Sequence, residues 1–201
     1  DWLIKIFVNN FGDGHFPPFD IDNDTFSDIS TFRGYDWKGA DCDEFNSKIY
    51  PGRRTGNKYF DHDCNGIYGV SDLDKKPYES IYCDSTTRLG VAVIGDSAGA
   101  HFSIPEKYFN ATMIQKGTYK DILRNVADEL DVPAESGYTG HRNTSVVSHS
   151  IYKYLRSWNL CNNNDYQNLG VNGGDSGNTW GNIKALKRDQ KNDHPLLIFL
   201  E

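Results

Sequence analysis

The stretch RLGVAVIGDSAGAHF, residues 88–102, constrains the fold more than any other part of the chain. An apolar, β-branched run at residues 89–94 is followed at once by Gly-Asp-Ser-Ala-Gly at 95–99, a pattern typical of a buried parallel strand that ends in a tight turn. Ligands bind at this edge of open α/β sheets. A serine there, Ser97, can be a nucleophile if a histidine and a carboxylate reach it, although the loop could also simply turn the chain.

The last two thirds of the chain alternate between predicted helices and strands. Apolar residues recur at helical spacing in two segments, and a third segment has Asp175 or Ser176 as its cap. Strands separated by helices predict an α/β fold, with a parallel sheet, right-handed crossovers and helices on both faces. The predicted helices are Tyr119–Leu130, Ser145–Leu160 and Asp175–Lys191, and the further strands are Tyr166–Val171 and a buried Leu196–Leu200.

The first third has a different character, since no helix or strand is predicted between Gly12 and Pro77. Residues 1–10 suit a short strand or a helix end equally well. A loop as long as residues 12–77 needs something other than an apolar core to order it. Residues 1–72 hold 13 acidic against 7 basic residues, which argues against a nucleic-acid partner and for bound cations. We therefore predict a calcium-binding, loop-rich segment at 1–77 and an α/β segment at 78–201.

Oxygen-bearing side chains in this first segment match the ligands that calcium prefers. Alternate carboxylates at 20, 22 and 24 can converge on one ion, and DHDCNGIYGVSD at 61–72 matches EF-hand loop positions 1, 3, 5, 6, 7 and 12. The flanking EF-hand helices are missing, and the alternative for any one of these acids is a solvated loop face. The candidate ligands are Asp20, Asp22, Asp24, the Phe26 carbonyl, Asp28, Asp41, Asp43, Asn46, Asp61, Asp63, Asn65, the Ile67 carbonyl and Asp72.

Four cysteines without a C-x-x-C pair predict two disulfides rather than a zinc or redox site. A bond between Cys42 and Cys64 would tie two of the acidic groups together, and it is one of three possible connectivities. Glycosylation sequons begin at Asn23, Asn110 and Asn143. Both features are typical of a secreted or lysosomal protein.

Two hydrolase patterns place a serine in this way. The G-x-S-x-G spacing fits the elbow of α/β-hydrolases, but no HGGG-type motif precedes it and Pro105 interrupts the helix that should follow. The V-I-G-D-S run, with N-L-G-V-N-G-G at 168–174, resembles the first two blocks of the SGNH, or GDSL, esterases and lipases. This resemblance implies a flavodoxin-like parallel sheet, Ser97 as the nucleophile, and the Ser97 and Gly173 amides as oxyanion donors, with Gly174 as the less favoured choice for the second donor.

A closer resemblance covers nearly the whole chain. The segments FGDGHFPPFDIDNDTFSDISTFRGYDWKGADCDEF, YPGRR, CNGIYGV, GDSAGAHFSIP and DYQNLGVNGG resemble the acyloxyacyl hydrolase family. This resemblance implies a secreted or lysosomal, calcium-containing lipase. Such an enzyme releases secondary fatty acyl chains from the lipid A of lipopolysaccharide, acts also on phospholipids, and has a saposin-like part as a partner. It also implies Ser97 and Gly173 as catalytic residues and the acids at 20–24 and 61–65 as calcium ligands.

The sequence departs from this family in two blocks. It contains neither the later G-N-D block nor the D-x-x-H pair that supplies the base, and no histidine here has an acid three residues before it. His101 lies close to Ser97 in sequence and is expected to form a wall of the pocket rather than the base. We expect the base to come from a carboxyl-terminal segment of the same enzyme, without which this chain is inactive. The alternative is a non-enzymatic, calcium-stabilised module that binds lipid or protein.

Overall fold

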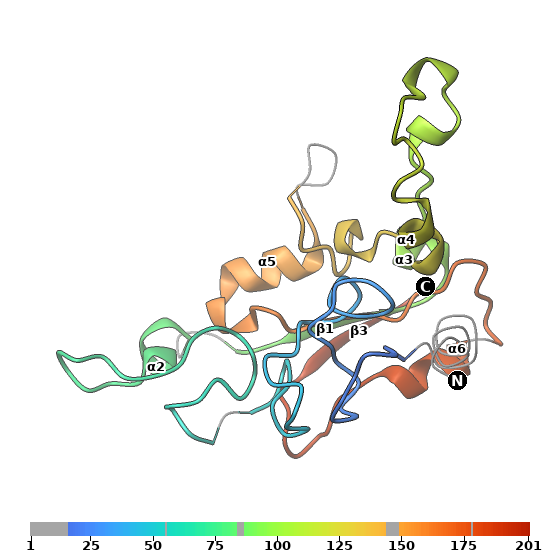
Figure 1. Ribbon diagram of the computed structural model, residues 1–201. Coiled ribbons are helices and arrows are strands. Elements are labelled where there is room, and N and C mark those ends of the chain that lie inside the picture. Colours follow the sequence, from blue (N-terminus) through green and yellow to red (C-terminus); the bar gives the residue numbers. More distant parts are fainter. Residues whose placement is uncertain (1–15, 55, 84–86, 144–148, 178) are drawn as a thin grey trace.

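A three-stranded parallel sheet lies at the centre of the computed structural model, which describes residues 16–54, 56–83, 87–143, 149–177 and 179–201. The middle strand is β1 (Gly90–Ile94), with β2 (Tyr166–Asn168) on one side and β3 (Leu196–Leu200) on the other (Figure 1). All five β1 side chains are buried, as expected for a parallel strand. The predicted α/β class and the β-branched strand before Ser97 are confirmed.

Short helices connect and flank the strands. The α-helices are α2 (Tyr78–Tyr82), α3 (Ser97–Ala100), α4 (Ile122–Ala127), α5 (Ile151–Trp158) and α6 (Thr179–Asn182). The 3₁₀ helices are η1 (Glu106–Tyr108), η2 (Ala111–Met113), η3 (Pro133–Glu135), η4 (Leu160–Asn162) and η5 (Ile183–Ala185). Within the described residues, none of these helices has the length and hydropathy needed to cross a bilayer.

Helical segments cover both faces of the sheet. Val91 packs with Tyr152 and Leu155 of α5, whereas Ile94 packs with Leu169 and with Ala185 of η5. Successive side chains of a strand point to opposite faces, so positions 91 and 94 lie on different faces of β1. Accordingly, α5 and the α6–η5 segment lie on opposite sides of the strands in Figure 1.

Two of the predicted helices are shorter than the periodicity suggested. The helix predicted at 119–130 forms only at α4, and α4 buries none of its side chains. The helix predicted at 145–160 is confirmed from Ile151, where the Ser150 hydroxyl caps it by accepting a hydrogen bond from the Lys153 amide at 3.0 Å. Residues 144–148 lie outside the described residues.

The predicted helix at 175–191 was wrong over most of its length, because aspartate side chains bind the backbone amides locally. Asp175 accepts a hydrogen bond from the Gly177 amide, and Asp189 accepts from the amides of Lys191 and Asn192. Such bonds compete with helical ones. The helical part is therefore limited to α6 and η5.

The bounds of β3 match the prediction, but its burial does not. Leu197, Ile198 and Leu200 are exposed, although the sequence predicted a buried strand. Only β1 pairs with β3 among the described strands. An apolar edge of this kind is therefore a surface that further protein could cover.

The loop-rich first segment packs onto the free side of β2. Asn168 donates its amide hydrogen to the Trp37 carbonyl at 2.7 Å, and Gly39 donates to the Tyr166 carbonyl at 2.9 Å. As predicted, described residues 16–77 contain no helix or strand. The segment is thereby fixed to the sheet, although the domain boundary at residue 77 stays a prediction and residues 1–10 lie outside the described ones.

Two disulfides hold this arrangement. Cys42 is bonded to Cys64, as the preferred pairing predicted, and Cys83 is bonded to Cys161. The first closes the loop between two acidic groups, and the second joins the end of α2 to η4. Both restrict the unfolded chain, which is the usual way in which disulfides stabilise loop-rich proteins.

A buried polar network fixes α3, the helix that carries Ser97. The Asn168 amide group donates to the Gly99 carbonyl at 2.8 Å and to the Thr139 hydroxyl at 2.9 Å, while its oxygen accepts from the Gly170 amide at 3.0 Å. The Ser136 hydroxyl also donates to the Gly99 carbonyl at 2.8 Å. The end of β2 therefore positions α3 directly.

We predict that Asn168→Leu lowers the free energy of unfolding by about 3 kcal/mol, because leucine leaves buried donors and acceptors of this network unpaired. Urea denaturation measures the change. The control is Gln190→Leu at an exposed position, which should shift the free energy by less than about 0.5 kcal/mol. Equal effects of the two substitutions would contradict the assigned role.

Stability should also depend on the charge of His194. Burial, reinforced by Arg88, Arg54 and Arg188, lowers the pKa of His194 from 6.5 to about 4. The folded protein therefore favours the neutral ring, so this contribution is complete above pH 6.5 and is lost as the pH falls toward 4. Across that window the melting temperature should fall more steeply for the wild type than for His194→Gln. If the melting temperatures of the two proteins fell in parallel as the pH is lowered, the assignment of a buried neutral ring to His194 would be wrong.

Candidate active site

Ser97 lies where the sequence placed it, at the carboxyl end of the central strand. It is the first residue of α3, and the Asp96 carboxylate caps this helix by accepting a hydrogen bond from the Ala98 amide at 2.8 Å. Ser97 is half-buried, and its hydroxyl forms no hydrogen bond with the described residues. The hydroxyl is therefore presented at the edge of the sheet without a fixed partner.

The loop after β2 contacts the Ser97 turn. The Val171 amide donates to the Gly95 carbonyl at 3.1 Å. A Cβ on Gly170 would lie 2.5 Å from the Ala100 amide nitrogen, so only glycine fits there. Parallel pairing of β1 and β2 thus brings the two glycine-containing loops predicted from the sequence side by side.

Gly173 lies in this second loop with a φ of +75°, a conformation that favours glycine. It is exposed, and a Cβ there would meet nothing within 4 Å. The Gly174 amide donates to the Val171 carbonyl at 2.8 Å, whereas the Gly173 amide has no acceptor among the described residues. Of the two glycines, Gly173 therefore has the amide that is free to bind a further acceptor.

No described histidine acts as a partner of Ser97. His101 ends α3 with a φ of 58°, and its carbonyl accepts a hydrogen bond from the Val132 amide, but its ring does not bond to the Ser97 hydroxyl. His62, His141 and His194 contact Phe60, Asp36 and Arg88, respectively. Within the described residues, the Ser97 hydroxyl therefore has no histidine partner.

Glu201 is an acidic group near Ser97 that the sequence analysis missed. Its amide donates to the Ile94 carbonyl at 3.1 Å, and its side chain lies against Gly95 and Gly99. Burial, with a smaller effect from Asp96, raises the pKa of this carboxyl. The sequence contained a signal for this position. The carboxyl ends of parallel strands meet at one edge of a sheet, and Glu201 directly follows β3.

The acids at residues 20–24 form one compact group. Carboxylate oxygens of Asp20, Asp22 and Asp24 lie within 4.8 Å of one another. Asp24 is fully buried, and burial raises its pKa from 3.8 to about 7. Close carboxylates with so little solvent are costly unless a cation or a proton compensates them. This group therefore suits a cation.

Residues of the 41–46 segment lie beside the Asp20–Asp24 group. Burial raises the pKa of Asp41 to about 6, and Asp22 is among the charges that act on it. Asp22, Asp24 and Asp41 each have a buried carboxylate oxygen without a hydrogen-bond donor in the described part of the chain. Asp43 and Asn46 lie close enough to affect Asp22. Unsatisfied, converging oxygens of this kind are what a calcium ion would bind.

Phe26 and Asp28 contact this group and its neighbour Glu44 through their backbone amides. The buried Phe26 amide donates to Asp24, and its ring stacks on Tyr50. Asp28 is exposed, and its amide donates to Glu44 at 2.6 Å. These contacts leave the roles of the Phe26 carbonyl and the Asp28 carboxylate as predictions.

The loop at 61–72 folds around its first aspartate. The Asp61 carboxylate accepts hydrogen bonds from the amides of Asn65 at 3.0 Å and Gly66 at 2.9 Å, and the Asn65 side chain accepts from the Ile67 amide. The loop therefore turns at Gly66, which has a φ of +82°, as the motif requires.

Two other positions of this loop fit calcium less well. Asp63 is buried with a pKa raised to about 8, mainly by burial, but Arg88 lies 3.3 Å from it. The Asp72 side chain is fully exposed and pairs with Lys75 at 3.5 Å. The structure thus does not bring Asp72 to the other carboxylates, and the 20–24 group is the better cation site.

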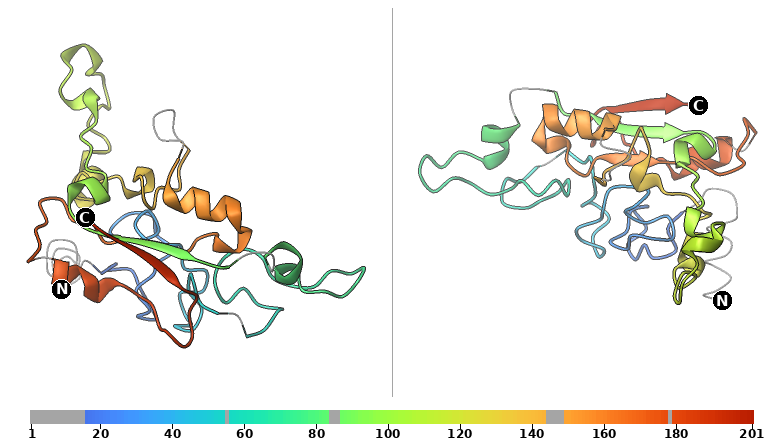
Figure 2. Two further views of the ribbon diagram at one scale, coloured as in Figure 1. Left: turned by 180° about the vertical axis from the view of Figure 1, so that it is seen from behind. Right: turned by 90° about the horizontal axis from the view of Figure 1, so that it is seen from above.

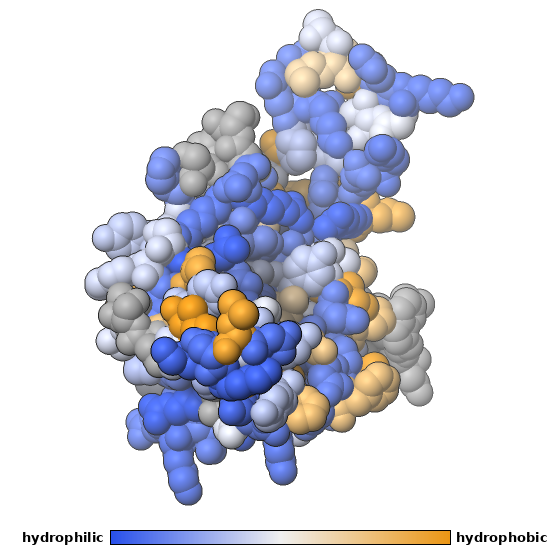
Figure 3. Space-filling model, turned by 90° about the vertical axis from the view of Figure 1, so that its left-hand side faces the viewer, coloured by the Kyte–Doolittle hydropathy of each residue, from blue (hydrophilic) through white to orange (hydrophobic). Residues whose placement is uncertain are grey.

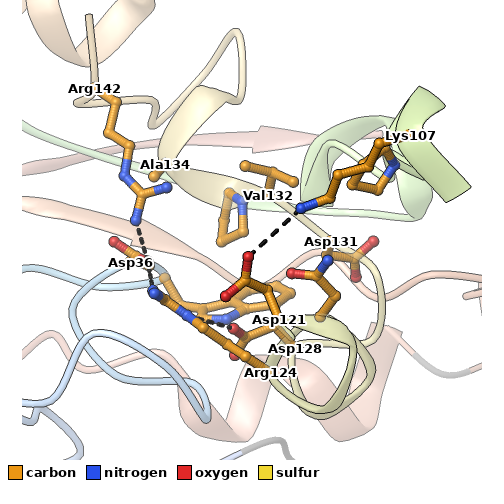
Figure 4. A pocket seen from close by; sticks show the side chains of 13 residues that line it. Asp36, Lys107, Asp121, Arg124, Asp128, Asp131, Val132, Ala134 and Arg142 are labelled. Atoms are coloured by element: carbon orange, nitrogen blue, oxygen red, sulfur yellow. Dashed lines mark hydrogen bonds and ion pairs between the residues drawn. The ribbon is translucent and has the colours of Figure 1, made fainter. Parts of the chain in front are cut away.

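A separate cavity of about 480 Å³ lies between α4 and residues 131–134 (Figure 4). Charged side chains in it pair with one another: Arg142 lies 2.6 Å from Asp36, and Lys107 lies 3.5 Å from Asp121. Ser97 is not among its lining residues. This charged lining does not suit an acyl chain, so the cavity has no assigned part in the reaction.

Comparison with known proteins finds three relatives that match most of this chain. The chain is 39% identical to acyloxyacyl hydrolase of Oryctolagus cuniculus over 199 residues, which are 97% of this chain and 34% of that protein. It is 40% identical to the Mus musculus protein and 39% to the Homo sapiens protein over 186 residues, which are 90% of this chain and 32% of each. No protein-family model matches. The chain is therefore homologous to about one third of the length of acyloxyacyl hydrolase, as the sequence motifs predicted.

Proposed function

We propose that this chain carries the nucleophile of a carboxylic ester hydrolase that acts on the acyl chains of lipids. The observation that carries the proposal is the placement of Ser97 at the edge of the sheet, beside the Gly170–Gly174 loop. Homology to acyloxyacyl hydrolase supports an esterase or lipase. More specifically, we propose secondary acyl esters on lipid A of lipopolysaccharide as the substrate, with phospholipid-type esters as a second class.

The proposed reaction uses Ser97 and two backbone amides. The Ser97 oxygen attacks the ester carbonyl while a base takes its proton, and the carbonyl oxygen becomes an anion between the Ser97 and Gly173 amides. Each such donor is worth about 3 kcal/mol to the transition state. The alcohol then leaves with the proton from the base, and water releases the fatty acid from the acyl-serine by the same steps in reverse.

We propose that the base lies outside these 201 residues. No described histidine bonds to Ser97, and no histidine in the sequence follows an acid by three residues. The exposed apolar edge of β3 is where further strands could add to the sheet. On this proposal, the chain by itself is inactive and a carboxyl-terminal segment of the same enzyme completes the site.

We also propose that calcium binds the first segment, with a structural role. Asp20, Asp22, Asp24 and Asp41 would hold one ion, because the first three carboxylates converge and Asp22, Asp24 and Asp41 each keep a buried oxygen without a hydrogen-bond donor among the described residues. Asp43 and Asn46 lie beside this group. The loop that begins at Asp61 would be a second, weaker site. Bound calcium would neutralise the converging carboxylates, and acyl transfer to a serine does not require it as a Lewis acid.

The two disulfides support secretion or a lysosomal location, because such bonds persist in oxidising compartments. A saposin-like chain is a further proposed partner, drawn from the family resemblance. The alternative function is a calcium-stabilised module that binds lipid or protein without catalysis. The lack of a histidine partner for Ser97 among the residues that the structure describes favours this alternative, so the decisive experiment must detect a reactive serine.

A fluorophosphonate probe makes this distinction in the longer protein that contains this chain. We expect it to label Ser97, because the completed site activates this hydroxyl, and we expect Ser97→Ala to abolish labelling. Ser103→Ala, a nearby serine outside the turn, is the matched control and should be labelled like the wild type. Mass spectrometry of the labelled peptide reads the result. Labelling that survives Ser97→Ala would remove Ser97 from the mechanism, and no labelling at all would favour the non-enzymatic module.

Calcium binding should raise the melting temperature. A site with a dissociation constant of about 10⁻⁴ to 10⁻³ M would stabilise the folded protein by about 1–3 kcal/mol in 10 mM calcium, an estimate from mass action. Asp24→Asn removes a central carboxylate and should lose most of this gain, while Asp74→Asn, an exposed acid outside the group, should keep it. Scanning calorimetry with calcium and with chelator measures both. An undiminished response in Asp24→Asn would place the ion elsewhere.

A further inference from the structure

An arm formed by residues 103–127 projects from the body directly after α3. Figure 1 and Figure 2 show it extending away from the sheet, and Figure 3 shows hydrophobic and hydrophilic side chains intermingled on it. Its base is fixed, since the Ser103 amide donates to the Leu130 carbonyl at 2.9 Å and Phe102 pairs with Asp131. The arm thus starts six residues after Ser97.

The two limbs of the arm contact each other in a defined way. The rings of Tyr108 and Tyr119 stack with centroids 5.6 Å apart, and the Asn125 side chain donates to the Tyr108 hydroxyl at 2.8 Å. Lys107 lies 3.5 Å from Asp121 across the same gap. The arm therefore presents its outer side chains on a formed scaffold.

Many of these outer side chains are apolar and exposed. Phe109 is 72% exposed and Leu123 is 81% exposed, and no residue of η1, η2 or α4 is buried. Apolar surface on this scale marks an interaction site more often than an ordinary protein surface. The exposed large apolar residues of the arm are Ile104, Phe109, Met113, Ile114, Tyr119, Ile122, Leu123 and Val126.

The charge of the arm is opposite to that of the rest of the chain. It holds four basic residues against two acidic ones, a net charge of +2, whereas the whole chain carries −7 and the remainder therefore −9. Lys116 and Lys120 are exposed close to the turn at Gly117. Basic side chains among exposed apolar ones favour attachment to anionic lipid surfaces, which attract the charges and accept the apolar groups.

We propose that the arm at residues 103–127 docks onto an anionic lipid surface and so brings the Ser97 edge to lipid. This inference extends the proposed function, but it concerns binding rather than the reaction. Its partner is defined by chemistry: negatively charged head groups above an acyl interior. A second copy of the chain, or another part of the longer protein, are the competing occupants of the same surface.

Vesicle flotation tests the proposal with the longer protein carrying Ser97→Ala, which cannot consume the lipid. Vesicles of phosphatidylcholine alone are compared with vesicles in which phosphatidylglycerol replaces part of it. We expect the protein to prefer the anionic vesicles. The double variant Lys116→Gln/Lys120→Gln should lose this preference by roughly tenfold or more, from the usual contribution of a surface lysine.

The second variant, Phe109→Ser/Leu123→Ser, should lower binding to both kinds of vesicle about tenfold or more, because it removes two side chains that would enter the lipid. Lys75→Gln and Leu73→Ser are matched controls, since Leu73 is 98% exposed and both residues lie outside the arm. Neither control should change vesicle binding.

The lysine variant decides the matter, because exposed lysines can be replaced without loss of folding. An unchanged anionic preference in this variant overturns the proposal. Unchanged vesicle binding combined with a lower melting temperature would show that the arm packs within the longer protein. Unchanged vesicle binding with a lost dimer, by light scattering, would show a second copy. Normal docking of the Ser97→Ala protein, combined with no fluorophosphonate labelling of the longer protein that retains Ser97, would overturn only the proposed reaction.

Discussion

Parallel pairing of β1 with β2 is the contact on which the candidate site depends. It aligns the carboxyl ends of the two strands, so the turn that carries Ser97 and the loop that carries Gly173 meet at one edge of the sheet. Asn168, the last residue of β2, then fixes α3 through the Gly99 carbonyl. A hydroxyl and a free amide are therefore positioned by backbone geometry rather than by long side chains.

The first segment is organised by charge instead of by an apolar core. Its buried carboxylates raise one another's pKa values, and burial has the largest effect on Asp24, Asp41 and Asp63. Charges held this way oppose folding unless protons or cations compensate them. The segment nevertheless binds the free side of β2 through Trp37 and Gly39. Because this segment binds β2, a proton or cation that compensates these acids also affects the stability of the sheet beside Ser97.

The sequence predicted those features that local chemistry determines. The β-branched run before Ser97 and the bounds of β3 follow from strand composition and turn residues, whereas the Cys42–Cys64 bond was one of three possible connectivities. It could not show which apolar faces are covered, because periodicity does not identify the partner of a face: β3 was expected to be buried and is exposed, and the apolar residues of α4 are exposed as well. Nor could it show that Asp72 points away from the other carboxylates, since this depends on tertiary contacts.

The proposed reaction requires that Ser97 becomes acylated. Incubation of the longer protein with a lipid ester, followed by acid quenching and peptide mass spectrometry, measures this directly. We expect a fatty acyl group on the peptide that contains Ser97, at a level that falls when Gly173 is replaced by a residue with a side chain. Release of fatty acid with the acyl group on another residue, or with none on Ser97, would contradict it.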